Sequence, residues 1–143
     1  ERTVFILDNE RKIAPIICYE SVYGEYVTEY VRKGANILAI ITNDGWWSES
    51  QGYKQHLSYA RIRAIETRRN ILRSANTGSS AVINFNGEIL KKLDYGKRGF
   101  INATAETINK LTFYVKYGDF IFRFSLFFFI IILLFSLSKK KIN

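Results

Sequence analysis

The sequence predicts a mixed α/β domain that is followed by one membrane-spanning helix. Short apolar segments that end in turn-forming residues alternate with two segments of helical periodicity, which is the pattern of helices covering a sheet. Towards the C-terminus lies an apolar run long enough to cross a bilayer. The chain can build a packed core, since 48% of its 143 residues are hydrophobic and 15% are aromatic, above the range of disordered chains.

Two strands and a helix are expected at the N-terminal end. Residues 3–7 and 13–18 are short apolar runs, and the turn-forming residues 8–10 connect them. A helical pattern begins at Ser21 and is ended by Gly34. Its apolar side chains share one face of the helix: Val22, Tyr26, Val27, Tyr30 and Val31.

A buried strand, a loop and a second helix follow. The unbroken apolar run at residues 37–41 is typical of a strand in a sheet that is buried on both faces. Residues 46–53 are expected to form a loop, and residues 56–69 a helix. The remaining strands are expected at residues 71–75, 81–85 and 88–93, with the Asn86-Gly87 turn joining the last two.

The apolar run at residues 120–137 predicts a membrane-spanning helix. At about 1.5 Å per residue it covers about 27 Å, close to the hydrocarbon thickness of a bilayer. Arg123 lies near one end, where its long side chain can reach the interface. Three lysines at residues 139–141 follow the other end, so the positive-inside rule places that end in the cytoplasm and the rest of the chain outside. A buried core helix is the alternative, which the length and the all-round hydrophobicity disfavour.

The chain divides into three parts at these positions. We expect part of a catalytic domain at residues 1–117, the membrane span at residues 118–138 and a basic tail at residues 139–143. Since the chain contains no methionine and begins at Glu1, we expect it to be a fragment, or a chain whose start has been removed.

Basic residues exceed acidic ones, and the net charge is +8. Such a balance indicates nucleic acid, an anionic membrane surface or no specific partner. No nucleic-acid motif accompanies the basic residues, so we expect no binding of nucleic acid. One arginine cluster is expected to form a solvated face with ion pairs, with lipid phosphates as its alternative contact: Arg61, Arg63, Arg68, Arg69 and Arg73.

The single cysteine, Cys18, is the strongest candidate for a reactive residue. It ends an apolar strand and directly precedes a helix, and a strand-to-helix turn presents the nucleophile in several α/β hydrolases. The free N–H groups at the start of that helix favour a thiolate and a developing oxyanion. A lone cysteine is also commonly a small buried hydrophobic residue, so both interpretations stay open on this pattern alone.

The order of motifs between residues 17 and 89 is more specific. ICYESVYGEYV contains a Cys-Tyr-Glu site, and TNDGWW is an Asn-Asp-aromatic loop. A Gln-His helix rich in Ala-Arg pairs, an Arg-Ser-x-Asn-x-Gly strand and an Asn-x-x-Gly-x-Ile hairpin come next, and Tyr117-Gly118-Asp119 precedes the terminal span. In this order and spacing the chain resembles the apolipoprotein N-acyltransferases of the nitrilase superfamily.

The resemblance implies part of a nitrilase-type α-β-β-α sandwich followed by a C-terminal transmembrane helix. It also implies an acyl transfer that uses no cofactor and no metal. The Cys18 thiolate would attack a phospholipid ester and form a thioester, and the amine of a diacylglyceryl-cysteine N-terminus of an apolipoprotein would then accept the acyl chain. The implied location is the bacterial inner membrane, with the catalytic domain in the periplasm and the tail in the cytoplasm.

Four further residues obtain roles from this resemblance. The backbone N–H of Tyr19 would be an oxyanion donor, Glu20 matches a functionally required glutamate, and Trp46-Trp47 match a substrate-entry loop. Structural alternatives stay open for them, because Glu20 also suits a helix start and the tryptophans suit packing or an interface. The preceding Asn43-Asp44 are interpreted as turn formers.

Two members of the nitrilase triad, a glutamate base and a lysine, cannot be placed in the chain. In the family both precede the cysteine by many residues, and here only 17 residues precede Cys18. Glu1, Glu10 and Lys12 lie too close to the cysteine in the sequence to replace them. We therefore expect this chain to be inactive on its own.

Other functions stay open beside the acyltransferase. A membrane-anchored carbon–nitrogen hydrolase of the amidase type is the main alternative, although amidases of this superfamily usually lack a terminal span. A non-catalytic membrane-tethered module is the third. A thiol-protease arrangement would pair His56 with Cys18, but a structural role is the favoured interpretation of this lone histidine.

Overall fold

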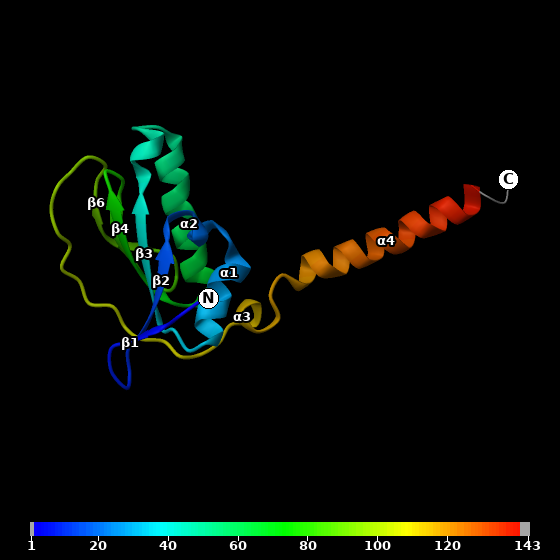
Figure 1. Ribbon diagram of the computed structural model, residues 1–143, viewed down its shortest axis with the longest axis horizontal. Helices are drawn as coiled ribbons and strands as arrows, with labels where there is room; N and C mark the ends of the chain where they lie inside the picture. Colours follow the sequence, from blue (N-terminus) through cyan, green and yellow to red (C-terminus); the bar gives the residue numbers. More distant parts are fainter. Residues whose placement is uncertain (1, 141–143) are drawn as a thin grey trace.

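A six-stranded sheet with two helices on one face forms the body of the molecule, and a long helix projects from it (Figure 1). The structure is a computed structural model, and it describes residues 2–140. The strands follow each other across the sheet in chain order: β1 (Phe5–Ile6), β2 (Lys12–Ile17), β3 (Ile37–Asn43), β4 (Asn70–Asn76), β5 (Ser80–Ile83) and β6 (Ile89–Leu93).

Two short 3₁₀ turns and four helices complete the secondary structure of the described chain. The turns are η1 (Cys18–Val22) and η2 (Asp44–Trp47). The helices are α1 (Gly24–Arg32), α2 (Gln51–Thr67), α3 (Phe113–Tyr117) and α4 (Phe120–Lys140).

The three central strands are parallel, and this brings their carboxyl ends to one edge of the sheet. β3 pairs in parallel with β2 and with β4, whereas β1, β5 and β6 join by antiparallel pairing. Parallel strands require crossover connections, which α1 and α2 provide. η1 follows β2 and η2 follows β3, so both turns lie at the same edge.

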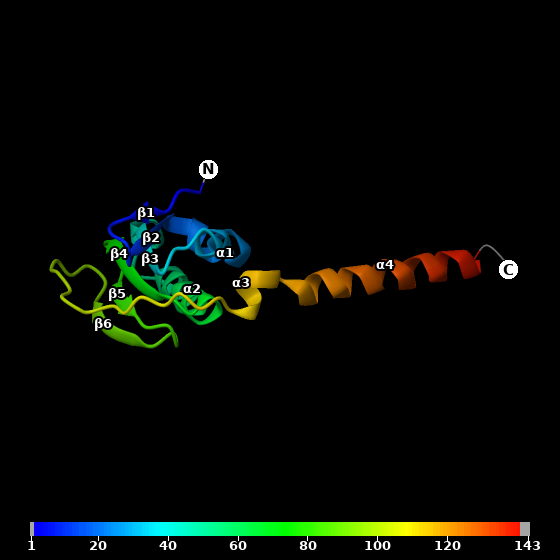
Figure 2. The same cartoon turned by 90° about the horizontal axis from the view of Figure 1, so that it is seen from below.

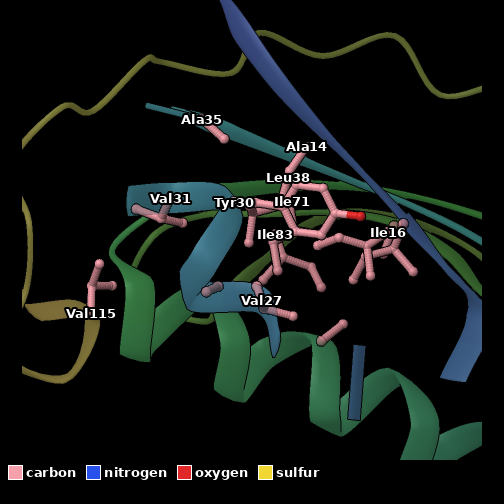
Figure 3. Close-up of a cluster of buried hydrophobic side chains, with 14 of the residues drawn as sticks. Ala14, Ile16, Val27, Tyr30, Val31, Ala35, Leu38, Ile71, Ile83 and Val115 are labelled. Carbon is pink, nitrogen blue, oxygen red and sulfur yellow. The ribbon is translucent and has the colours of Figure 1, made fainter. Parts of the chain in front are cut away.

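The hydrophobic core lies between the sheet and the helices α1 and α2 (Figure 3). Alternation along the strands supplies its sheet side, because every second side chain points to the same face. The fully buried strand residues of this core are Ala14, Ile16, Leu38, Ile40, Ile71 and Ile83. Val27 and Val31 of α1 and Ala60 and Ala64 of α2 close the core from the helix side.

The opposite face of the sheet is only partly covered. Residues 94–112 connect β6 to α3 (Figure 2). Phe100 and Ile101 of this segment line a cavity of about 510 Å³ together with Ile41 and Leu72. Ile17 and Ile41 on this face stay 52% and 54% exposed. Within the described chain, β3 is therefore buried on the face that packs against the helices. Its other face, expected to be buried too, is exposed near the carboxyl end at Ile41.

The expected elements are present, but three of their boundaries are corrected. The strand expected at residues 3–7 is reduced to β1 (Phe5–Ile6). The helix expected from Ser21 begins instead as η1 and continues as α1 from Gly24. The loop expected at residues 46–53 is wrong, because η2 occupies its start and α2 begins at Gln51. Ser50 starts α2 early, since its hydroxyl accepts the N–H of Gly52 at 3.2 Å and so caps the helix.

α4 leaves the α/β body on the side that carries α1 and α3 (Figures 1 and 2). Its segment Phe120–Ser138 has a mean hydropathy of 2.6, is 0% buried and is long and apolar enough to cross a membrane. The division of the chain at residues 117 and 118 stays a prediction, and residues 141–143 of the expected tail lie outside the described residues.

A polar joint, formed by Glu25, Asp119 and Arg123, connects α4 to α1. Arg123 Nη2 lies 2.7 Å from Glu25 Oε1, and the backbone N–H of Asp119 donates to the same oxygen at 2.8 Å. Gly118 has a φ of +67°, and a Cβ there would collide with Glu25 Oε1. The start of α4 is therefore fixed beside the N-terminal end of α1, which begins two residues after the end of η1.

We expect Leu38→Ala to destabilise the fold by about 2–5 kcal/mol, because it removes a large side chain from the core and leaves a cavity. Leu38 is fully buried in β3. Ile41→Ala in the same strand is the matched control, since Ile41 is 54% exposed, and it should cost less than about 1 kcal/mol. Denaturant unfolding of the chain in detergent micelles measures both, and equal losses would contradict this assignment of the core.

Candidate active site

Cys18 lies where β2 ends and η1 begins, at the edge shared by the parallel strands. Its φ is +50°, a left-handed conformation that few non-glycine residues adopt. Hydrogen bonds on both sides hold the turn: Glu20 Oε2 accepts the N–H of Ile17 at 2.8 Å, and the Ser21 hydroxyl donates to the Cys18 carbonyl at 2.8 Å. The cysteine residue is half-buried, between the core and the exposed surface.

Thr42 of β3 contacts the cysteine sulfur directly. Its Oγ1 lies 3.2 Å from Cys18 Sγ and 3.0 Å from Asp44 Oδ1. The sheet register places Ile17 of β2 beside Ile41 of β3, so the next residue of each strand, Cys18 and Thr42, stands at the same level. The threonine links the sulfur to the carboxylate of Asp44.

Asp44 is the centre of the buried polar network at this edge and has no exposed surface. Its Oδ2 accepts from Arg73 Nη2 at 2.7 Å, and its Oδ1 accepts from His56 Nδ1 at 3.0 Å. A Cβ on Gly78 would collide with this carboxyl group, so a glycine is needed there. Burial opposes ionisation of Asp44, but the hydrogen bonds from His56 and Arg73 outweigh burial and hold its pKa below the usual value.

His56 faces the carbonyl of Cys18, and not its sulfur. The imidazole is 2% exposed, and its Nε2 lies 3.0 Å from Ser21 Oγ and 3.3 Å from the Cys18 carbonyl oxygen. Since Nδ1 donates to Asp44, the ring is fixed between the carboxylate and the nucleophile's backbone. This geometry favours the structural interpretation of His56 over a Cys–His pair.

The residues next to the cysteine support its turn. Both carboxylate oxygens of Glu20 accept hydrogen bonds, one from the Ile17 N–H and one from the Tyr26 hydroxyl, so Glu20 braces η1 as a helix-start carboxylate does. The Tyr19 ring packs against Trp47 and His56, with centroids 6.4 Å and 5.9 Å apart. The assigned roles of Tyr19 and Glu20 in the reaction stay predictions.

The two tryptophans of η2 differ in their surroundings. Trp47 packs edge-on against His56, with a centroid distance of 5.2 Å. Trp46 is 81% exposed. The packing interpretation therefore suits Trp47, and Trp46 is the one free for contact with a substrate or a membrane.

The structure corrects two interpretations of polar residues. Three of the five clustered arginines are buried, because Arg63, Arg69 and Arg73 are 6%, 1% and 4% exposed, so a solvated face is wrong for them. Asp44 is more than a turn former, whereas Asn43 does form the turn by accepting the N–H of Gly45 at 3.1 Å. The alternation of β4, which places Arg73 on the same face as Ile71, was the sequence signal for an inward arginine.

No group of three or more His, Cys, Asp and Glu side chains that could hold a metal ion occurs within residues 2–140. The chemistry that this site can offer rests on the thiol of Cys18 and the hydrogen bonds around it.

Comparison with known proteins decides the family. The carbon-nitrogen hydrolase family model matches residues 2–107. The chain belongs to the carbon-nitrogen hydrolase family. It is thus a member of an enzyme family, and the expected resemblance and the mixed α/β fold of the nitrilase superfamily are confirmed.

Several relatives in this family are named apolipoprotein N-acyltransferase. That of Rhizobium etli strain CIAT 652 is 39% identical over 109 residues, covering 76% of this chain and 20% of the relative. That of Agrobacterium fabrum strain C58 is 43% identical over 103 residues, 72% of this chain and 19% of the relative. That of Rickettsia bellii strain RML369-C is 35% identical over 133 residues, 92% of this chain and 26% of the relative. The chain spans about a fifth to a quarter of these relatives' length.

Solved structures of carbon-nitrogen hydrolases share the fold. A carbon-nitrogen hydrolase from Helicobacter pylori G27 superposes with a TM-score of 0.58 at 20% identity, covering 65% of this chain and 40% of that one. A glutamine-dependent NAD⁺ synthetase from Acinetobacter baumannii gives a TM-score of 0.60 at 18% identity, covering 69% of this chain and 20% of that one. At this identity the likeness concerns the fold.

We expect Asp44→Asn to destabilise the carbon-nitrogen hydrolase fold by about 3–5 kcal/mol at neutral pH, because it leaves the buried Arg73 cation without its carboxylate. The lowered pKa means that the ionised Asp44 stabilises the fold above the unfolded pKa of about 3.9, and that this contribution is lost as the pH falls through the folded-state value. The difference between wild type and variant should therefore shrink below about pH 4.

Urea unfolding at several pH values from about 3 to about 7, a range that includes the ordinary carboxyl pKa, measures this difference. Asp94→Asn is the control, since Asp94 pairs with Lys92 at the surface and its side chain is 68% exposed. An Asp44→Asn chain as stable as the Asp94→Asn chain would show that the buried network carries no such constraint.

Proposed function

We propose that the chain carries the nucleophile of an apolipoprotein N-acyltransferase. The enzyme would move a fatty acyl chain from a phospholipid to the diacylglyceryl-cysteine N-terminus of an apolipoprotein, through a thioester on Cys18. The observation that carries the proposal is the position of Cys18, half-buried and left-handed at a strand-to-helix turn. The relatives that bear the acyltransferase name support the same substrate class.

Two half-reactions with balanced atoms make up the proposed transfer. The Cys18 thiolate attacks the ester carbonyl, the carbon–oxygen bond breaks, and a lysophospholipid leaves with the proton that the thiol gave up. The amine of the acceptor then attacks the thioester, a carbon–nitrogen bond forms, the carbon–sulfur bond breaks and the thiol is restored. Both steps pass through an oxyanion, for which the backbone N–H of Tyr19 at the start of η1 is the proposed donor.

Features of the molecular surface support a lipid substrate. Tyr19, Tyr23 and Trp46, which belong to or follow the turns at the nucleophile edge, are 50%, 62% and 81% exposed. Exposed aromatic side chains of this kind are enriched where proteins meet the headgroup region of a bilayer. The polar joint fixes the start of α4 beside the end of α1 that adjoins η1, so a bilayer crossed by α4 would lie on the side of the nucleophile turn.

The proposed location is the bacterial inner membrane. α4 would cross it, with the α/β body in the periplasm and the lysine-rich tail in the cytoplasm, as the positive-inside rule requires. The 133-residue match to the Rickettsia bellii protein supports α4 as a part of the proposed enzyme. Because it leaves out only a few residues of the chain, that match extends past the α/β body into α4.

A membrane-anchored amidase is the second candidate. The likeness to the amidase from Nesterenkonia sp. AN1, with a TM-score of 0.55 at 18% identity, supports the fold that such an enzyme needs. Amide hydrolysis would use the same cysteine and pass through a thioester intermediate, with water in place of the acceptor amine. The exposed aromatic residues and α4 favour the lipid acyltransferase.

We expect Cys18→Ala to abolish acyl-enzyme formation in membranes that contain the whole gene product, because it removes the thiol on which the proposed thioester forms. Phospholipid with a labelled acyl chain should transfer label to the wild-type protein, and hydroxylamine should release it as it releases a thioester.

Ser58→Ala is the control, since Ser58 lies on the exposed side of α2 and its hydroxyl donates to the Lys54 carbonyl of the same helix at 3.0 Å. Label on the Cys18→Ala protein would refute the nucleophile assignment. Release of ammonia from an amide, without labelling by phospholipid, would identify the amidase instead.

A further inference from the structure

We propose that Thr42 orients the sulfur of Cys18 in both its protonated and its ionised form, and that Asp44 is the positioning residue that holds Thr42. The proposal rests on the proposed function of Cys18 as the nucleophile and adds two residues to its site. Thr42 is the side chain whose hydroxyl stands between the sulfur and the buried carboxylate, 3.2 Å from one and 3.0 Å from the other.

Thr42 is well suited to fix another side chain. It is 6% exposed and lies in β3, which is paired on both sides by parallel strands. A threonine has few allowed rotamers because its Cβ is branched. The hydroxyl therefore points at Cys18 Sγ from a rigid strand, and the sulfur itself sits on a turn that is held in an unusual backbone conformation.

The Thr42 hydroxyl can hydrogen-bond to the sulfur both as a thiol and as a thiolate. A threonine hydroxyl carries one hydrogen and can also accept. Asp44 is ionised, so its oxygens only accept, and they already receive hydrogens from Arg73 and His56. When Cys18 is a thiol, its S–H can donate to Thr42 while Thr42 donates to Asp44. When Cys18 is a thiolate, the Thr42 hydrogen turns to the sulfur, and Asp44 keeps its two other donors.

This exchange moves a hydrogen and no heavy atom. The sulfur thus keeps one partner at one distance before attack, when it is ionised, and after the acyl chain has left, when it is a thiol again. His56 also contacts the turn that carries Cys18: since its Nδ1 donates to Asp44, its Nε2 can accept from the Ser21 hydroxyl, 3.0 Å away. One buried carboxylate is therefore linked to the sulfur through Thr42 and to the η1 turn through His56 and Ser21.

Thr42→Val tests the proposal because it keeps the shape of the side chain and removes the hydroxyl. The chain has a single cysteine, so the rate of alkylation by iodoacetamide, followed by mass spectrometry at one pH, reports on Cys18 alone. We expect alkylation of Thr42→Val to be about tenfold slower than wild type, since a hydrogen bond to a charged group is worth more than one to the neutral thiol. Thr42→Ser, which restores the hydroxyl, should react within about twofold of wild type.

A matched control separates this effect from a general loss of packing. Thr67 is fully buried, and its hydroxyl donates to the Arg63 carbonyl at 2.6 Å, in α2 and away from the sulfur. Thr67→Val should alkylate at the wild-type rate. Thr42→Ala, a smaller residue, should be as slow as Thr42→Val and replaces it if valine disturbs the fold.

The outcomes distinguish this proposal from the proposed function. Wild-type alkylation of both Thr42→Val and Thr42→Ala, or slow alkylation of Thr42→Ser, would overturn the role of Thr42. Labelling of the variants by phospholipid in membranes with the whole gene product is measured in parallel. If no form of the protein accepts label while Thr42→Val alkylates slowly, the acyltransferase proposal fails and the role of Thr42 at the sulfur stands.

Discussion

The ionised Asp44 carboxylate has no exposed surface, and the site around it is arranged to compensate this charge. A buried charge is costly unless it is paired and fully hydrogen-bonded. Arg73 comes from β4 and His56 from α2, so the compensation connects two elements to the turn after β3. The same carboxylate is linked to the Cys18 sulfur through Thr42 and to the η1 turn through His56 and Ser21. The edge that carries the nucleophile is therefore held by one charge and its donors.

Periodicity was enough to predict the frame of the fold. The short apolar runs and the Asn86-Gly87 turn predicted the strands β2 to β6 and their order along the chain, because such patterns are local. Because the apolar run of β2 ends directly before a helical pattern, the position of Cys18 at the edge of the sheet could also be predicted. The start of α2 was missed, since a serine cap acts through one hydroxyl that leaves no periodic signal.

The network behind the nucleophile was not predictable in the same way. His56 and Arg73 lie 12 and 29 positions from Asp44 in the sequence. In the sequence, a polar residue at a strand end is the same signal whether it forms an exposed turn, like Asn43, or is the buried centre of a hydrogen-bond network, like Asp44. Arg73 looked like one more member of a basic cluster, and only the parallel register of β3 with β4 brings it to this carboxylate. Sequence patterns give each strand its faces, but pairing between distant strands decides which polar residues meet.

The backbone of Cys18 also limits which nucleophiles this turn can present. Its φ of +50° is tolerated by a small unbranched side chain but is strained for a residue with a branched Cβ. A serine fits the same conformation, so an exchange of sulfur for oxygen chemistry needs no change in the turn. A threonine also carries a hydroxyl, but its branched Cβ is strained at a positive φ, a cost that this fold accepts at Thr77, whose φ is +65°. The turn therefore favours a small, unbranched nucleophile through its backbone dihedral angle, whatever the reactivity of the side chain.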